Sequence, residues 1–434
     1  MRFFKIVVCV MGLGACDFPR PAPIGDDAGR TSDAGAQTDG EAPIDSVSGH
    51  VCAPSQALRC DGNTLVRCNA DGTAEASESC ALGCNATEVR CNDVAPSNGL
   101  AGALDMTSGE IDFDLRATAT INTDDGTVQV GGNPIAMRTT TITQTSAPTI
   151  RVLVVRSLIT SDVTVIGSNA LAIVSNGDIK INGTFAASAH ADAAGAGRFN
   201  DSSCQGKGGD LGANGAVSGS AGGGFGGNGG NGGTATSNKG NIVPGGARGL
   251  PAGNAELLPL RGGCDAGPFF GPGPRTGGGG GAIQLVSRTK ISIAGVVAAN
   301  GGSNAGGGSG GGILLEAPVI ESTGNMVANG GAGAGANGTD ACFNVGEDGR
   351  LDAMPAIGGL GCSSFSSRGG NGAARNTGAS NGDDINGVSL NSPVALAGHG
   401  GGGVGRIRIN TASGGLNATG VFSPNPTIGT IATR

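Results

Sequence analysis

A short phrase recurs four times in this chain and constrains its fold more than any other feature. It is an alternating apolar strand, a glycine, a second apolar stretch, and then Ala-Asn-Gly-Gly or a close variant. The copies are ALAIVSNGDIKINGTFAAS (170–188), AIQLVSRTKISIAGVVAANGG (282–302), GILLEAPVIESTGNMVANGG (312–331) and GRIRINTASGGLNATGVFS (405–423). A unit this short cannot bury its own apolar face, so the copies must stack on one another. The repeat therefore predicts a solenoid.

The sequence between and before the copies has the pattern of short β-strands. Runs such as IRVLVVRSLI are rich in Val, Ile and Thr and are bounded by Gly, Asn, Asp or Pro, and no stretch shows a capped helical period. In the second copy Ile283 and Leu285 are followed by Ile291 and Ile293, so that each pair points to one face. We predict an all-β chain whose residues 100–434 form a right-handed parallel β-helix-like solenoid. A β-sandwich is the alternative.

The spacing of the copies predicts two long insertions. Ile283 and Ile313 are 30 residues apart, whereas Ile173 precedes Ile283 by 110 residues and Ile313 precedes Ile407 by 94. The insertions fall at about 190–280 and 332–403, where much of the glycine (87 of 434 residues) is concentrated. In 206–233 every third residue is Gly, Ala or Ser, the period of a polyproline-II-type helix. A polyglycine-II bundle is predicted, with a flexible linker or irregular loops as alternatives.

The N-terminus has the features of an export signal. In residues 1–15, Arg2 and Lys5 precede an apolar stretch that is too short to span a bilayer, which takes about 20 residues. The stretch ends in Leu-Gly-Ala-Cys16, which resembles the lipobox of bacterial lipoproteins. That resemblance implies cleavage before Cys16 and lipidation of this residue. An ordinary signal peptide is the alternative. Residues 16–50 are rich in Pro, Asp, Ala and Gly, which predicts a lipidated flexible tether.

Cysteines are grouped in two ways along the chain. Residues 51–93 hold six of them, namely Cys52, Cys60, Cys68, Cys80, Cys84 and Cys91. In an exported chain these predict a small module with three disulfides, of which fifteen connectivities are possible. A zinc site is the disfavoured alternative, because no Cys-x-x-Cys pair is present. Each insertion carries two more cysteines, which predicts the disulfides Cys204–Cys264 and Cys342–Cys362.

Residues with the chemistry for catalysis are few. The formal charge is −8 and no run of Lys or Arg is present, which argues against nucleic-acid binding. Carboxylates gather in the second insertion, where acidic residues are either turn formers or, on a β-helix, sites for acid–base work or calcium. They are Glu347, Asp348, Asp352, Asp383 and Asp384. No cofactor or metal site is predicted.

Two further features lie at the edges of the insertions. His190 and His399 border them and could meet in space, although a histidine pair without a nucleophile is more often structural. Phe269-Phe270 is a conspicuous apolar pair, suited either to contact with a partner or to packing of the insertion on the solenoid.

The order of lipobox, acidic tether, cysteine module and glycine-rich repeat resembles a group of bacterial surface lipoproteins with β-helical, glycine-rich regions. The phrases GGGGGAIQL…AGVVAANGG and GGGVGRIRI carry this resemblance. It implies attachment to the cell envelope, at the outer membrane or cell surface, through a lipid anchor in the membrane. We therefore expect a non-enzymatic structural or adhesive protein with a surface glycan or protein as partner. The alternatives are a β-helix enzyme acting on an extracellular polysaccharide, or a protein-binding module in 51–93.

Overall fold

The computed structural model describes residues 51–269, 275–336, 344–361, 367–386 and 395–434. The predicted signal peptide, the tether, Cys16, Phe270, Cys342 and Cys362 lie outside these ranges. The fold is nearly all β, with 35% of residues in strands and 3% in helices. Residues Val51–Arg434 form one compact unit. The described part of the chain contains no helix with the length and apolar character needed to cross a membrane.

The cysteine-rich segment folds into two small antiparallel sheets. β1 (Ala57–Asp61), β2 (Thr64–Cys68) and β3 (Glu75–Ser79) form the first, and β4 (Cys84–Asn85) and β5 (Arg90–Cys91) form the second. Three disulfides join them, namely Cys52–Cys68, Cys60–Cys84 and Cys80–Cys91. A segment with this little apolar interior depends on such cross-links to stay folded.

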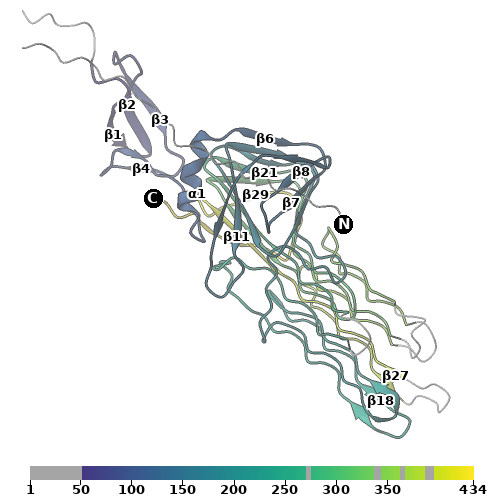
Figure 1. Ribbon diagram of the computed structural model, residues 1–434. Coiled ribbons are helices and arrows are strands. Elements are labelled where there is room, and N and C mark those ends of the chain that lie inside the picture. The colour runs from purple at the N-terminus through teal and green to yellow at the C-terminus, as the bar shows by residue number, and fades with distance from the viewer. Residues whose placement is uncertain (1–50, 270–274, 337–343, 362–366, 387–394) are drawn as a thin grey trace, which may run out of the picture. The chain divides into compact units, whose positions relative to one another are not determined.

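Three sheets contain most of the strands in the remaining chain (Figure 1). Each repeat contributes one strand to each of these sheets. Sheet 1 has the order β10 (Arg138–Ile142), β11 (Ile150–Val155), β14 (Ala170–Ser175), β20 (Ala282–Ser287), β23 (Gly312–Glu316), β28 (Arg406–Thr411), β31 (Thr427–Thr430). Sheet 2 has the order β29 (Asn417–Ala418), β24 (Val319–Ser322), β21 (Lys290–Ile293), β15 (Ile179–Ile181), β12 (Ser157–Thr160), β6 (Asp112–Leu115). Sheet 3 has the order β30 (Phe422–Ser423), β25 (Asn325–Val327), β22 (Val296–Ala298), β16 (Thr184–Ala186), β13 (Val163–Ile166), β7 (Ala119–Asn122), β8 (Val128–Val130), β9 (Asn133–Ile135). All pairs are parallel except those of β10, β8 and β9.

The apolar residues of the repeats line up strand over strand. In sheet 1, Leu171, Ile283, Ile313 and Ile407 face one another across neighbouring strands and are at most 2% exposed. Ile173 lies opposite Leu285 rather than Ile283, so the first copy is aligned two residues away from the register expected from the sequence. Equivalent columns from sheets 2 and 3 join the same buried cluster, which fills the space between the three sheets.

The outer face of sheet 1 is covered by the chain that follows the cysteine-rich segment. α1 (Ala101–Asp105) and η1 (Met106–Gly109) lie there, and Leu100 and Leu104 are fully buried against the sheet. Beneath them Glu316 is 1% exposed and accepts hydrogen bonds from Ser97 Oγ (2.7 Å) and Gln284 Nε2 (2.7 Å). A buried carboxylate is tolerated because these donors replace the water it has lost.

All the glycine-rich chain leaves the sheets at one corner, after a strand of sheet 3 and before the next strand of sheet 1. Residues 187–281, 299–311 and 328–405 are here called the first, second and third excursions. The sequence predicted two insertions, whereas the structure adds the short second excursion between them. Because neighbouring repeats stack in register, the three excursions start side by side and extend from the sheets together (Figure 1).

Short strands occur within the first and third excursions. β17 (Ala216–Val217) pairs with β27 (Ala395–Leu396), and β18 (Ala235–Thr236) pairs with β19 (Ile242–Val243) and β26 (Ile385–Asn386). Figure 1 places β18 and β27 far from the three sheets.

Candidate functional site

The recurring Ala-Asn-Gly-Gly phrase builds the base of the excursions. Asn300 and Asn329 occupy equivalent positions just after sheet 3 and are at most 1% exposed. The Asn300 carboxamide oxygen accepts the Asn329 amide (2.8 Å), and the Asn329 carboxamide oxygen accepts Ser423 Oγ (2.5 Å). Asn329 Nδ2 also donates to the carbonyl oxygens of Arg350 and Asp352, both at 2.7 Å. The side chains thus form a ladder at the start of the second and third excursions.

Beyond this ladder the excursions are joined by backbone hydrogen bonds. Gly307 of the second excursion donates to the Gly400 carbonyl of the third (2.9 Å) and accepts from Gly223 of the first (3.0 Å). Gly230 of the first excursion donates to the Gly401 carbonyl of the third at 2.7 Å. Most of these residues lie outside any strand. We call this network the glycine lattice.

The lattice depends on the absence of side chains. At Gly307 an added Cβ would lie closer than 3.0 Å to the Gly331 carbonyl oxygen and to the Gly402 nitrogen. The same close approach to a backbone carbonyl occurs at most lattice glycines. Gly378, by contrast, would place a Cβ with nothing within 4 Å. Glycine is therefore required here by close approach of backbones, and not chiefly for flexibility.

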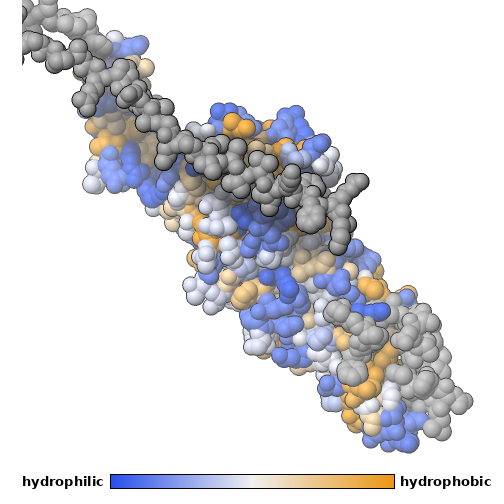
Figure 2. Space-filling view, in the orientation of Figure 1, coloured by the Kyte–Doolittle hydropathy of each residue, from blue (hydrophilic) through white to orange (hydrophobic). Residues whose placement is uncertain are grey.

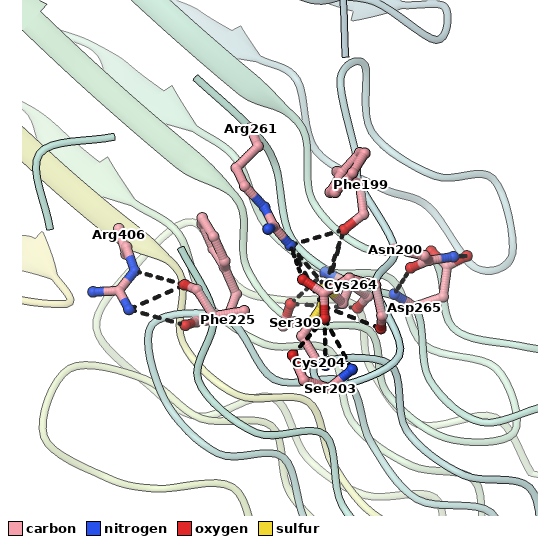
Figure 3. Close-up of polar contacts among 12 residues, drawn as sticks. Phe199, Asn200, Ser203, Cys204, Phe225, Arg261, Cys264, Asp265, Ser309 and Arg406 are labelled. Atoms are coloured by element: carbon pink, nitrogen blue, oxygen red, sulfur yellow. Dashed lines mark hydrogen bonds and ion pairs between the residues drawn. A yellow bond between two sulfur atoms is a disulfide. The ribbon is translucent and has the colours of Figure 1, made fainter. Parts of the chain in front are cut away.

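A buried guanidinium lies where the first excursion returns to the sheets. Arg261 is 7% exposed and stacks on the Phe199 ring at 4.6 Å and on the Phe225 ring at 5.6 Å. Its Nη2 donates to Asp201 Oδ2 (3.0 Å) beside the disulfide Cys204–Cys264. Figure 3 shows this arrangement, in which the Arg406 guanidinium also lies over the Phe225 ring, 5.5 Å from its centre. The cluster ties the two ends of the first excursion together.

The surroundings of this cluster shift the pKa of Asp201 and of Arg406. Burial would raise the pKa of Asp201, but hydrogen bonds from Ser203, Arg261 and backbone amides lower it to about 2. Burial lowers the pKa of Arg406, which donates to the carbonyl oxygens of Ala252 (3.1 Å) and Phe225 (3.3 Å). Each group is used in packing and bonding within the protein.

His399 lies inside the lattice, whereas His190 is bonded to Asp348. It is 1% exposed, and its Nδ1 accepts the Ser220 amide at 2.9 Å. Burial lowers the pKa of His399 to about 4, so that the ring is neutral near pH 7. Phe269 meets the His399 ring edge to face at 5.4 Å, which supports the packing interpretation for this phenylalanine.

Two of the predicted carboxylates bond to backbone amides, Asp348 to the first and second excursions and Glu347 within the third. Asp348 accepts the Ala191 amide (3.1 Å) and the Ser303 amide (2.6 Å), and its other oxygen meets His190 Nδ1 at 2.5 Å. Glu347 accepts both nitrogens of the Arg350 fork, at 2.8 and 2.9 Å, and the Ile357 amide.

The other three carboxylates also accept backbone amides. Asp352 accepts Met354 (2.8 Å), Asp383 accepts Arg368 (3.3 Å) and Asp384 accepts Thr234 (2.6 Å). The five carboxylates are therefore distributed along the lattice. Within the described residues, no group of three His, Cys, Asp or Glu side chains could hold a metal ion.

Two grooves lie where the first and third excursions meet. The larger, of about 660 Å³, has Asp383 and Asp384 in its lining. The smaller, of about 300 Å³, is lined by residues that include Arg248 and Arg375. Neither arginine carries a signal in the sequence, because the lattice alone brings these distant segments together.

The surface of the third excursion also presents large apolar side chains. Val345, Leu351, Met354, Ile357 and Leu360 are each 45–57% exposed. Figure 2 shows further hydrophobic surface near the part of the molecule where Figure 1 places β18 and β27, which is separate from Leu351, whose carbonyl oxygen accepts Asn325 of β25. Exposed apolar groups of this kind are suited to contact with another surface.

No family model matches this chain, and neither a curated protein nor a solved structure was found to match it.

Proposed function

We propose that this chain is a non-enzymatic lipoprotein of the bacterial cell envelope, structural or adhesive at the cell surface, and that its excursions contact the partner. The glycine lattice carries the proposal, because it builds a long hydrogen-bonded projection mainly from backbone. The predicted carboxylates are engaged with backbone amides of that projection. This use favours a binding or spacer role over acid–base chemistry.

The finer architecture that fits this role is a right-handed parallel β-helix formed by the three sheets. Support comes from the regular contribution of one strand per repeat to each sheet around a shared core. Parallel crossover connections are right-handed in nearly all known cases. In a β-helix, the strands that one repeat contributes to sheets 2 and 3 belong to the same turn of the solenoid. Short proton–proton distances measured by NMR between these two strands would test this arrangement.

We infer polyglycine-II geometry for the lattice. Residues 219–226 exchange backbone hydrogen bonds with chain at 230–233, 246–249, 307 and 400–404. A β-strand has two neighbours in its sheet, whereas a helix with three residues per turn directs its backbone groups to several sides. Solid-state carbon chemical shifts of the lattice glycines would distinguish the two geometries.

Lipidation of Cys16 is the part of the proposal that fixes the location. The lipobox-like ending of the N-terminal apolar stretch supports it. Bacteria that produce the full chain are grown with an alkyne analogue of palmitate, and the protein is recovered from membrane fractions. We expect the wild-type chain to carry the palmitate label and the Cys16→Ala variant to lack it. Equal labelling of both would contradict lipidation at this residue.

The adhesive role is tested with whole cells. Bacteria that display the chain are applied to arrays of glycans and matrix proteins, together with cells that produce Gly307→Ala or Gly109→Ala. Gly109 lies outside the excursions, and a methyl group added to it would have no other atom within 4 Å. Adhesion above empty-vector cells, lost in Gly307→Ala and kept in Gly109→Ala at equal surface levels, is expected. Absence of adhesion by wild-type cells across the arrays would leave only the structural role.

A further inference from the structure

The smaller groove combines two cationic side chains with neutral polar ones. Arg248 of the first excursion and Arg375 of the third line it, together with Asn228, Asn376 and Thr377. Its volume of about 300 Å³ suits a small ligand. Among its lining residues, all of them in the described part of the chain, there is no Asp or Glu.

Among the described residues, the side chains of these two arginines have no hydrogen-bond or ion-pair partner, unlike those of most other arginines. Eleven arginines of the described chain form ion pairs, for example Arg156 with Asp112 and Arg198 with Asp265. For Arg248 and Arg375 only the backbone amides are bonded within the described residues, to Asn231 Oδ1 (3.0 Å) and Ser423 Oγ (2.6 Å). Two unpaired guanidinium groups at one groove, in a chain of charge −8, create a local positive site.

Arg375 has a backbone conformation that glycine would adopt more readily. Arg375 has φ 51°, in the left-handed region that disfavours residues with a Cβ. It stands in the tight turn between Ala374 and Thr377, whose backbones bond each other. Glycine would adopt this conformation without strain and is abundant in the neighbouring chain. Strain that is kept where a simpler residue would relieve it is typical of functional positions.

We propose that this groove binds the anionic group of an acidic saccharide. The proposal rests on the adhesive role and gives the chemical class of the partner for that role. The planar fork of an arginine donates two parallel hydrogen bonds to the oxygens of a carboxylate or of a sulfate. Asn228, Asn376 and Thr377 offer donors and acceptors for sugar hydroxyls. Carboxylated and sulfated sugars share this chemistry, and the test separates them.

Binding is measured by calorimetry with the purified full chain in detergent. The probes are a trimer of galacturonic acid, a sulfated disaccharide, neutral maltotriose and inorganic sulfate. At least one acidic sugar is expected to bind, more weakly as salt is raised, and the neutral sugar is not. Arg248→Gln and Arg375→Gln should each weaken binding at least tenfold. Arg368→Gln is the matched control, since Arg368 is exposed in the same excursion and lies outside the groove lining; it should stay within twofold.

Arg375→Gly separates a binding role from a structural one. It should lose binding as Arg375→Gln does, while its urea midpoint equals or exceeds that of the wild type because the strain is relieved. Unchanged affinity in both Arg248→Gln and Arg375→Gln, equal affinity for inorganic sulfate and the sugars, or a lowered midpoint in Arg375→Gly would each overturn the proposal. Cells that adhere equally with and without Arg375→Gln would refute this groove while leaving the adhesive role standing.

Discussion

Replacement of Gly307 by alanine tests the glycine lattice most directly. Gly307 is buried in the second excursion and is hydrogen-bonded to both other excursions, through the Gly400 carbonyl and the Gly223 amide. A methyl group at this position would lie against the Gly331 carbonyl oxygen, closer than real side chains come. The neighbouring backbones must therefore move apart, and hydrogen bonds of 2.9 and 3.0 Å would be stretched beyond their useful range.

The size of the effect follows from these two bonds. Each lost hydrogen bond costs about 1 kcal/mol net, and a buried group left unsatisfied costs about 1–3 kcal/mol. At about 1–3 kcal/mol for each of the two bonds, we expect Gly307→Ala to lower the free energy of unfolding by about 2–6 kcal/mol, a large part of the 5–15 kcal/mol typical of whole domains. Gly378→Ala is the matched control, since nothing lies within 4 Å of its Cβ and its φ is not left-handed. It should change stability by no more than about 1 kcal/mol, as a gain.

The measurement is urea unfolding followed by far-UV circular dichroism, because the chain has no Trp or Tyr for intrinsic fluorescence. Hydrogen exchange read by mass spectrometry localises the effect. Peptides that contain the amides of Gly223 and of residue 307, which donate the two bonds, should exchange at least about 30-fold faster in Gly307→Ala, since 1.4 kcal/mol corresponds to a tenfold change in equilibrium. Equal urea midpoints and equal exchange in Gly307→Ala and Gly378→Ala would refute the argument that these backbones are in contact.

Three further perturbations address other parts of the excursions. Burial lowers the pKa of His399 from 6.5 to about 4, so between these values the unfolded chain gains a proton that the folded chain does not. The free energy of unfolding should therefore fall by about 3 kcal/mol as the pH drops from 7 to 4. Urea titrations at several pH values should show this decrease in the wild type and not in His399→Gln. Asn329→Ala removes ladder bonds and should cost about 1–3 kcal/mol by urea unfolding, against a negligible cost for the exposed Asn133→Ala. The double variant Cys204→Ala/Cys264→Ala opens a cross-link between residues 60 positions apart and should cost about 4 kcal/mol by calorimetry.

Each of these has a clear contrary result. Identical pH dependence in the wild type and His399→Gln would mean that His399 does not titrate differently in the two states. An Asn329→Ala variant as stable as Asn133→Ala would contradict the claim that the asparagine ladder stabilises the fold. A cysteine double variant with wild-type stability would mean that the Arg261 cluster alone closes the first excursion.

The strands of the repeats were predictable because their apolar residues alternate, and alternation alone specifies which side chains face a core. The nearly all-β content is confirmed. The alignment of Ile173 was off by two residues because Leu171 satisfies the same apolar pattern, and only the paired backbones decide between them. The presence of disulfides in the cysteine-rich segment followed from the number of its cysteines and the predicted export of the chain, whereas their connectivity depends on how its two sheets meet.

The lattice could not be derived from sequence, because one glycine is indistinguishable from another. Which amide meets which carbonyl is decided by the shared starting corner of the excursions, a property of the stacked repeats. The contact of Asp348 with His190, and the common groove of Arg248 and Arg375, depend on that pairing and carry no local signal. The repeated asparagines were the signal that could have been used, since a polar residue recurring at the end of an apolar repeat points to a side-chain ladder.

The shared corner has a consequence for how such chains can diverge. The asparagine ladder sets the position of the second and third excursions at their base, and the backbone contacts that follow require glycine but no particular side chain. Residues at the far turns, such as the turn between β18 and β19, can therefore be exchanged, lengthened or shortened without disturbing the sheets. Related chains could keep one scaffold while altering what its far end recognises, with insertions and deletions confined to those turns.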